Sequence, residues 1–389
     1  MVPVKLDVAL VIDALPAIGG AEKVLLAAME LFPHAPIYTL IYNRSAFSNT
    51  SLANRQVITS GMERLPMARK QYRMLLPLMP YLIGRFDLQQ YHKVISFSYA
   101  VAHGVRTLPG QIHLSYTYTP MRYAWRGYGL NGEQKPGNGI LPLLFQAFRH
   151  WDIGAAARVE RFAAVSHWIA RLMKNVYRRD ATVIYPPVEV ERFSHQAKRR
   201  NYYVTVARLV AHKRIDLVVE AFNRLKLPLL VVGEGTERHR LEHLAQSNIC
   251  FLGFQPDQEI AALLNHARGY ICAGEEDFGI AMVEAQAAGC PVIAYRRGGS
   301  LETIVEGQTG LFFNEQTCEN LCEAVLRCEQ KINQFDNLNI AANARRFNKE
   351  RFLHEFSAFV EMKPPSLPPQ SPLPVRDFLR TISYEHDMP

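Results

Sequence analysis

The sequence has few cysteines, and their spacing gives no metal or redox motif. Its six cysteines among 389 residues all lie in the C-terminal half, and none forms a CxxC pair. Cys318, Cys322 and Cys328 share one expected helix, where a metal site is conceivable, but thiols in apolar surroundings are more often simply buried. We therefore expect reduced cysteines, which fit a cytosolic location.

The sequence also lacks any apolar run of 18 or more residues, the length that a membrane-spanning helix requires. Its first twenty residues, "MVPVKLDVALVIDALPAIGG", carry Asp7 and Asp13 where a signal peptide would be apolar. We interpret this stretch as the first strand of a cytosolic protein.

Acidic residues are outnumbered by basic ones, so the net charge is +8 and the pI is near 9.1. This balance predicts an anionic partner: nucleic acid, acidic phospholipid or a phosphorylated small molecule. The positive charge is spread along the chain without a recognised nucleic-acid-binding motif, which disfavours nucleic acid.

Short apolar runs alternate with helical patterns along most of the chain. "VKLDVALVID", "GGAEKVLLAAMELF" and "APIYTLIY" read as strand, helix and strand, and the same order restarts at "NYYVTVARL". Such alternation predicts βαβ units and parallel sheets. The chain is long enough for two cores, so we expect two Rossmann-like, doubly wound domains.

Composition suggests where these domains begin and end. Pro186 and Pro187 open an extended, then basic, segment that we interpret as a linker over 186–201. The predicted N-terminal domain is then 1–185 and the C-terminal domain 202–362, with its last helix packing back on the N-terminal domain. Residues 363–389 begin with six prolines in twelve residues and predict an extended tail. Ligands of such sheets bind beyond the carboxyl ends of the strands, which predicts a site in a cleft between two facing domains.

Two stretches carry residues suited to an anionic ligand. "RLVAHKR" places Arg208 at a strand end and Lys213 near the next helix, where both cations could hold a diphosphate. The alternative is a pair of solvated surface charges.

The second stretch is "GEEDFGIAMVEAQAAGCPVIAY", residues 274–295. Its helix start would expose the amides of Phe278, Gly279 and Ile280 to hydroxyls or phosphate. Glu284 lies among apolar residues, where a carboxylate is costly unless it is bonded, and sugar or ribose hydroxyls are suitable donors. Glu276 could serve a second ring. The alternative for Glu284 is a glutamate favoured only by the helix dipole.

These motifs together resemble glycosyltransferase family 4, whose members are retaining, use nucleotide sugars and have the GT-B fold. The E-x7-E pair (Glu276 and Glu284), "VARLVAHKRIDLVVEAF", "VVGEG" and "PVIAYRRGGSLETIVEGQTGLFF" match its C-terminal half. "GGAEKVLLAAMELFP", "TYTPMRYAW" and "VIYPPVEVERF" are similar to bacterial O-antigen and exopolysaccharide enzymes, many of them mannosyltransferases. The resemblance covers roughly residues 4 to 345.

The resemblance implies a role for each matched residue. Arg208 and Lys213 neutralise the departing diphosphate, Glu276 contacts the donor sugar, and Glu284 binds the ribose. The amides of Phe278, Gly279 and Ile280 meet sugar hydroxyls and phosphate, and Gly19 and Gly20 form the glycine loop that approaches the diphosphate. No metal or other cofactor is implied, because the two cations can stabilise the leaving group and no DxD-type pair is clearly placed.

The sequence departs from the family pattern at two tyrosines. Tyr118, in "TYTPMRYAW", and Tyr99, in "SFSYAVAHGV", stand where relatives often have histidine. A tyrosine hydroxyl can donate a hydrogen bond but is not a base near neutral pH. We include Tyr118 among the catalytic candidates and keep open that it is only a strand-end aromatic.

The resemblance implies transfer of a hexose, with mannose favoured and GDP-mannose a possible donor, to a lipid-linked or polysaccharide acceptor in cell-envelope glycan synthesis. Residues 62–86 mix Arg64, Arg69, Lys70, Arg73 and Arg85 with apolar side chains, which suits peripheral contact with an anionic membrane on its cytosolic side. A solvated basic face is the alternative.

Two other classes of protein stay open. A nicotinamide-dependent oxidoreductase is disfavoured because Gly19 and Gly20 do not form G-x-G-x-x-G. A catalytically impaired module that only binds sugar nucleotides is the stronger alternative, because of Tyr99 and Tyr118.

Overall fold

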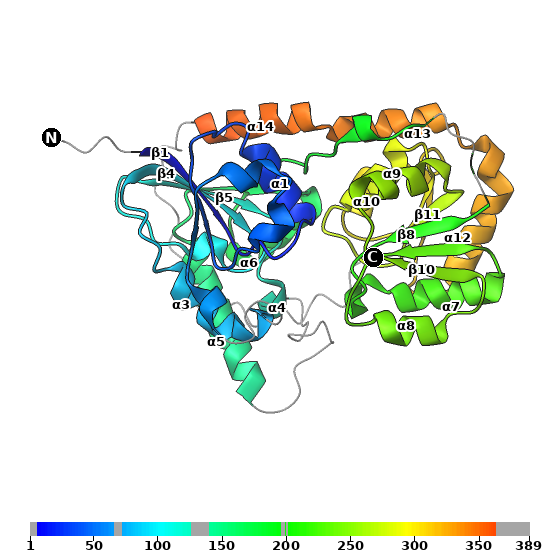
Figure 1. Cartoon of the computed structure of the whole chain (residues 1–389), viewed down its shortest axis with the longest axis horizontal. Helices are drawn as coiled ribbons and strands as arrows, with labels where there is room; N and C mark the ends of the chain where they lie inside the picture. Colours follow the sequence, from blue (N-terminus) through cyan, green and yellow to red (C-terminus); the bar gives the residue numbers. More distant parts are fainter. Residues whose placement is uncertain (1–5, 66–71, 126–139, 196–198, 200, 363–389) are drawn as a thin grey trace. The chain divides into compact units, whose positions relative to one another are not determined.

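The computed structural model describes residues 6–65, 72–125, 140–195, 199 and 201–362, and divides into two α/β units (Figure 1). Unit 1 takes its described residues from Met1–Ala164, Ile169–Val183 and Ser357–Pro389. Unit 2 takes them from Val165–Trp168 and Ile184–Phe356. The expected tail, 363–389, lies outside the described residues, as do Arg69 and Lys70.

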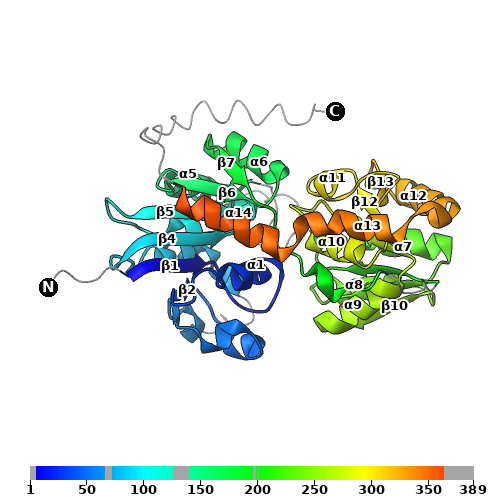
Figure 2. The same ribbon diagram turned by 90° about the horizontal axis from the view of Figure 1, so that it is seen from above.

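Unit 1 is built on a parallel sheet of seven strands. They run in the order β3-β2-β1-β4-β5-β6-β7, and Figure 2 shows β2 to β7 side by side in that sequence of neighbours. The inner strands are largely buried, as expected for a parallel sheet covered on both faces, whereas the edge strands β3 and β7 are partly exposed. The strands are β1 (Leu6–Ile12), β2 (Ile37–Thr39), β3 (Val57–Thr59), β4 (Tyr91–Ser98), β5 (Ile112–Thr117), β6 (Arg161–Ala164) and β7 (Ala181–Val183).

Helices connect these strands. α1 (Gly20–Ala28) begins where the amide of Gly19 donates to the Glu22 carboxylate at 3.0 Å, an arrangement that fixes the helix start. The others are α3 (Met79–Ile83), α4 (Arg122–Trp125), α5 (Ile140–Ala156) and α6 (His167–Tyr177), with short 3-10 turns that include η4 (Tyr72–Leu78) and η5 (Ala102–Gly104).

The end of α14 (Lys349–Glu361) also belongs to unit 1. The Lys93 ammonium donates to the carbonyl of Val360 at 2.9 Å, and the Arg161 guanidinium lies 5.5 Å from the centre of the Phe359 ring. A cation at the last carbonyls of a helix is favourable, so these contacts hold the last turns of α14 on the sheet of unit 1.

Unit 2 contains a six-stranded parallel sheet in the order β10-β9-β8-β11-β12-β13. Its strands are largely buried except for the edge strand β10, and the neighbouring loops at their carboxyl ends share one edge of the sheet. The strands are β8 (Tyr203–Val206), β9 (Leu229–Val232), β10 (Ile249–Gly253), β11 (Gly269–Cys272), β12 (Val292–Tyr295) and β13 (Gly310–Phe313).

The helices of unit 2 cover both faces of this sheet. α7 packs against α8 and α12, while α10 packs against α9 and α13 (Figures 1 and 2). The helices are α7 (Ile215–Leu225), α8 (Arg238–Leu244), α9 (Asp257–His266), α10 (Ile280–Ala287), α11 (Ser300–Thr303), α12 (Cys318–Lys331) and α13 (Asn337–Ala344), with 3-10 turns η6 (Val190–Arg192) and η7 (Ala211–Lys213).

The expected linker segment is partly ordered within unit 2. Val188 pairs with Asn348, and η6 packs against α10. This segment therefore carries side chains to the same part of the unit as α10.

The two parallel sheets confirm the α/β architecture that the alternating pattern predicts. The pattern identifies this class because the apolar spacing of a strand or a helix is a local property. Within the described ranges, no helix combines the length and apolarity needed to cross a membrane.

The core of unit 2 gives a test of this packing. Phe222 on α7 is completely buried, and its ring meets that of Tyr203 edge to face at 5.3 Å. We expect Phe222→Ala to lower the free energy of unfolding by about 3–5 kcal/mol, because it leaves a cavity. Urea denaturation measures this loss. Leu326→Ala, at a position on α12 that is 49% exposed, serves as the control and should change stability by less than about 0.5 kcal/mol; equal losses would contradict the packing.

Candidate functional site

The order of strands in unit 2 locates its candidate site. The order reverses between β8 and β11, so the loops that follow these two strands diverge at the carboxyl edge of the sheet. In open parallel sheets, ligands bind at such a switch point. The loop after β8 carries Arg208 and Lys213, and the loop after β11 carries Glu276.

An ion pair joins the two loops. The Lys213 ammonium donates to Oε1 of Glu276 at 2.6 Å, and each side chain is about one-fifth exposed, at 19% and 20%. A Cβ at Gly274 would lie 2.9 Å from the His212 carbonyl oxygen and 2.9 Å from the Lys213 Cα, so only glycine permits this approach. Arg208 lies two residues after the end of β8 and is exposed. The structure therefore brings Lys213 and Glu276 together, with Arg208 in the same loop.

The start of α10 lies in the loop after β11. Gly279 precedes the helix with φ of +93°, a conformation that glycine adopts readily. In the described part of the chain we find no internal acceptor for the amides of Phe278, Gly279 and Ile280. The helix start can therefore donate to an anion or a hydroxyl. The Phe278 ring, by contrast, is buried against Phe347 at 5.3 Å.

Glu284 lies in the second turn of α10 and is buried, with 6% of its surface exposed. Its Oε1 accepts a hydrogen bond from Nη2 of Arg192 at 2.9 Å. The Nη1 of the same guanidinium lies 2.6 Å from the Asp257 carboxylate at the start of α9. Sequence reasoning missed Arg192, because nothing in "VEVERF" indicates which carboxylate its guanidinium meets.

A buried thiol is close to Glu276. Sγ of Cys272, at the end of β11, is 3.9 Å from Oε1 of Glu276. Burial first, and then the nearby carboxylate, raise the pKa of this thiol far above its usual range. The thiol therefore stays protonated near neutral pH and does not act as a nucleophile. The described residues contain no cluster of three or more His, Cys, Asp or Glu side chains that could hold a metal ion.

A carboxylate also occupies the switch point of unit 1, which lies between β1 and β4. Asp13 follows β1 and accepts hydrogen bonds from four successive amides after β4: Tyr99 at 2.7 Å, Ala100 at 3.2 Å, Val101, and Ala102 at 2.7 Å. Burial raises the pKa of Asp13, and these amides oppose the shift. A buried carboxyl group thus fills the switch point of unit 1.

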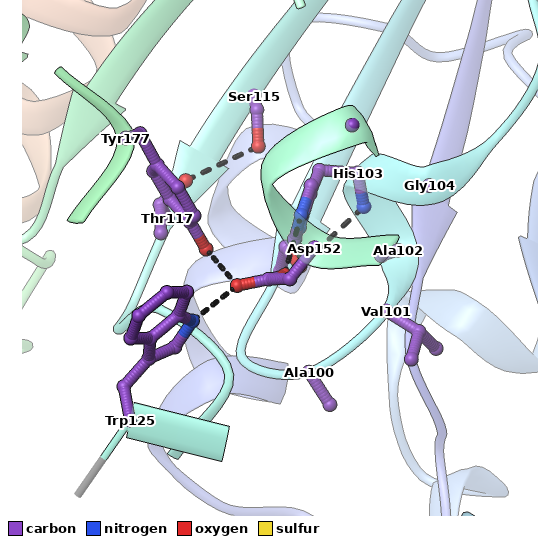
Figure 3. A network of polar contacts seen from close by, with 12 residues as sticks. Ala100, Val101, Ala102, His103, Gly104, Ser115, Thr117, Trp125, Asp152 and Tyr177 are labelled. Atoms are coloured by element: carbon purple, nitrogen blue, oxygen red, sulfur yellow. Dashed lines mark hydrogen bonds and ion pairs between the residues drawn. The ribbon is translucent and has the colours of Figure 1, made fainter. Parts of the chain in front are cut away.

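The same loop continues into a buried polar network. Nε2 of His103 lies 3.0 Å from Oδ1 of Asp152, and its Nδ1 lies 2.8 Å from the Ser98 hydroxyl. Oδ2 of Asp152 accepts from the Trp125 indole at 2.6 Å and the Tyr177 hydroxyl at 2.8 Å (Figure 3). His103 and Asp152 are 2% and 0% exposed, so this network supports the loop and is closed to substrates.

The candidates expected in unit 1 also lie together. Gly19 and Gly20 begin α1, and the Tyr118 hydroxyl donates to the carbonyl of Ala21 at 2.8 Å. The rings of Tyr99 and Tyr118 are 6.3 Å apart. Burial raises the pKa of Tyr118 well above its usual range, so the hydroxyl remains a donor. In this structure Tyr118 ties the end of β5 to the glycine loop.

The structure thus combines two parallel α/β units with cations and a carboxylate at the switch point of the second. Residues 188–346 match the family model described as Glycosyl transferases group 1. This match covers most of unit 2 and shows that this part of the chain is similar to group 1 glycosyl transferases.

Relatives and a solved structure support the same class. An uncharacterized glycosyltransferase of Methanocaldococcus jannaschii is 25% identical over 201 residues, 50% of this chain and 56% of that relative. A GDP-mannose-dependent alpha-(1-6)-phosphatidylinositol monomannoside mannosyltransferase of Mycolicibacterium smegmatis is 27% identical over 223 residues, 49% of this chain and 57% of that relative. The chain spans about half the length of the curated relatives it matches.

HepE of Anabaena, solved in complex with UDP and glucose, is similar in structure. Its TM-score is 0.67 at 15% identity, with 92% of this chain and 100% of that chain covered. This likeness confirms the predicted GT-B fold.

The contact of Tyr118 with α1 can be tested by removing its hydroxyl. We expect Tyr118→Phe to lower the free energy of unfolding by about 0.5–1.5 kcal/mol, the usual net value of one hydrogen bond. Thermal denaturation measures the change. The matched control is Tyr42→Phe, since the Tyr42 hydroxyl has no hydrogen-bond partner among the described residues. No difference between the two variants would mean that the Tyr118 hydroxyl does not hold the loop.

Proposed function

We propose that this protein is a retaining glycosyltransferase that moves a hexose from a nucleoside-diphosphate sugar to a lipid-linked or polysaccharide acceptor in cell-envelope glycan synthesis. The observation that carries the proposal is the Lys213–Glu276 pair, with Arg208 in the adjoining loop, at the switch point of unit 2. The pair joins an ammonium, which is suited to phosphate, to a carboxylate, which is suited to sugar hydroxyls.

The geometry of the pair explains how both ligands can be held at once. An ammonium has three donors and a carboxylate about four acceptor positions. Lys213 can therefore donate to Glu276 and to a diphosphate together, while Glu276 accepts from sugar hydroxyls. Their 2.6 Å contact sets the spacing between the two parts of the donor, so the sugar–phosphate bond would lie beside both side chains.

Charge development gives these residues their chemical roles. Breaking the bond between the anomeric carbon and the phosphate leaves negative charge on the diphosphate. Lys213 and Arg208 would stabilise this charge without any metal, because cations already in position cost no reorganisation. Amides at the start of α10 would add donors to the same anion or to sugar hydroxyls.

The donor proposed is GDP-mannose. Its support is the name of the Mycolicibacterium smegmatis relative, a GDP-mannose-dependent mannosyltransferase. HepE was solved with UDP and glucose, so UDP sugars belong in the same test.

A second candidate is a sugar-nucleotide-binding module with impaired catalysis. The observation that favours it is the Tyr118 hydroxyl, which donates to the Ala21 carbonyl where a catalytic side chain would face the sugar. Binding of nucleotide sugars without turnover would be the property of such a module.

Turnover distinguishes the two functions. We expect the full chain to release nucleoside diphosphate from one member of a panel of GDP, UDP and ADP sugars when lipid-linked and glycan acceptors are present. Lys213→Met should lower this release by about 100- to 1,000-fold, because the leaving group loses a fixed cation. A coupled diphosphate assay measures it, and Lys331→Met on α12 is the control. Binding without release in the wild type would favour the module, and neither binding nor release would overturn both.

We further propose that the protein acts at the cytosolic face of an anionic membrane through unit 1. Met74 and Tyr81 are 60% and 59% exposed, and Leu78 lies between them on the same run of helical turns. The Arg85 guanidinium donates to the Tyr81 hydroxyl at 2.8 Å. Exposed apolar side chains beside arginine suit the boundary between headgroups and acyl chains.

Lipid vesicles test this surface. The protein should bind vesicles containing phosphatidylglycerol and bind pure phosphatidylcholine more weakly, and the double variant Met74→Ser/Tyr81→Ser should weaken binding by at least about tenfold, from the apolar area that no longer inserts. Vesicle cosedimentation measures the affinity. Leu338→Ser, at a 61% exposed position on α13 of unit 2, is the matched control. Equal binding by both variants would place the contact elsewhere.

A further inference from the structure

Arg192 connects three elements of unit 2 through a single guanidinium. It ends η6, and its two terminal nitrogens contact different carboxylates: Nη2 lies 2.9 Å from Glu284 on α10, and Nη1 lies 2.6 Å from Asp257 on α9. Glu189, one turn earlier, is 4.0 Å away. The forked shape of a guanidinium permits contacts of this kind, which a point charge does not.

The burial of these groups shows which contact matters most. The side chain of Glu284 is 8% exposed and that of Arg192 is 16% exposed, whereas Asp257 and Glu189 are 47% and 68% exposed. A carboxylate in such surroundings is costly unless charge and hydrogen bonds compensate it. Arg192 supplies this compensation to Glu284, while its contact with Asp257 fixes the guanidinium from the other side.

Stability alone does not account for this arrangement. Replacing a buried ion pair with apolar side chains of similar size is often neutral or stabilising, so the pair is weak evidence for a purely structural role. Glu284 is instead four residues into the helix whose start donates to the candidate site. Holding its carboxylate in one position has a direct consequence for any ligand bound there.

We propose that Arg192 is a positioning residue that keeps the Glu284 carboxylate aimed at the ribose hydroxyls of the nucleotide, an inference that rests on the proposed function. A carboxylate offers about four acceptor positions, and Arg192 uses one of them on Oε1. The hydroxyls of a nucleotide ribose are donors of the kind that a carboxylate accepts. Because Arg192 contacts the carboxylate rather than the ligand, its loss should matter only for nucleotides that Glu284 can recognise.

The test compares nucleotides with and without ribose hydroxyls. Isothermal titration calorimetry on the full chain would use GDP, UDP and ADP and their 2′,3′-dideoxy counterparts. For the nucleotide that binds, we expect Arg192→Met to weaken affinity by about tenfold, the value of a charge-assisted hydrogen bond, and to leave the dideoxy form within about twofold of wild type. In Glu284→Gln, adding Arg192→Met should cause no further loss, since the two residues act as one unit.

Two further variants separate positioning from folding. Arg192→Lys retains the charge but cannot contact both carboxylates at once. We therefore expect a partial loss of affinity for the ribose form. This variant replaces Arg192→Met in the test if Arg192→Met is unfolded. Arg268→Met removes another ion pair of unit 2, with Glu329, and should leave both nucleotide forms unaffected.

The outcomes distinguish this inference from the proposed function. Equal weakening of the ribose and dideoxy forms by Arg192→Met, or no weakening of either, would overturn the role of Arg192 while leaving the proposed function standing. Failure of the wild-type protein to bind any of the three nucleotides would overturn the proposed function, and this inference with it.

Discussion

Parallel strands end at one edge of a sheet, and where the strand order reverses, two loops diverge and their polar groups lose the partners that a continuing strand would supply. Each unit of this protein meets that constraint with a carboxylate that crosses the gap. In unit 1, Asp13 reaches four amides after β4. In unit 2, Glu276 reaches the ammonium of Lys213. These contacts join the two loops at the switch point of each unit.

The two carboxyl groups differ in how exposed they are and in which donors surround them. Asp13 is 2% exposed and accepts from protein amides, so the carboxyl group of the protein itself already fills its loop. Lys213 and Glu276 are each about one-fifth exposed, and the amides of Phe278, Gly279 and Ile280 at the start of α10 lack internal acceptors within the described residues. Unit 2 therefore offers a cation, a carboxylate and backbone amides, the groups on which the proposed function rests. The buried His103–Asp152 network, by contrast, stabilises the loop that holds Asp13.

Buried carboxylates in both units are compensated by hydrogen bonds and ion pairs to several donors. Asp152 accepts from an indole and a phenol while it faces His103 (Figure 3), and Glu284 is matched by the guanidinium of Arg192. Each carboxylate is fixed by donors from elements far apart in sequence, because an unpaired buried charge would be too costly. For Asp152 the result is a rigid loop. For Glu284 the result is a carboxylate held in one orientation beside the candidate site.

The sequence by itself determined the parallel α/β architecture, since the apolar period of a strand or helix is written in neighbouring residues. It also placed Arg208 at a strand end, Lys213 near the helix that follows it and Glu276 in the loop after another strand, and such loops converge on one edge of a parallel sheet. Only the tertiary structure decided the partners. The contacts of Glu284 with Arg192, of Tyr118 with Ala21 and of Asp13 with the loop after β4 join residues 86 to 97 positions apart. No local pattern encodes such pairs, because they depend on how the strands are ordered and on which side chains the packed helices bring within a few ångströms.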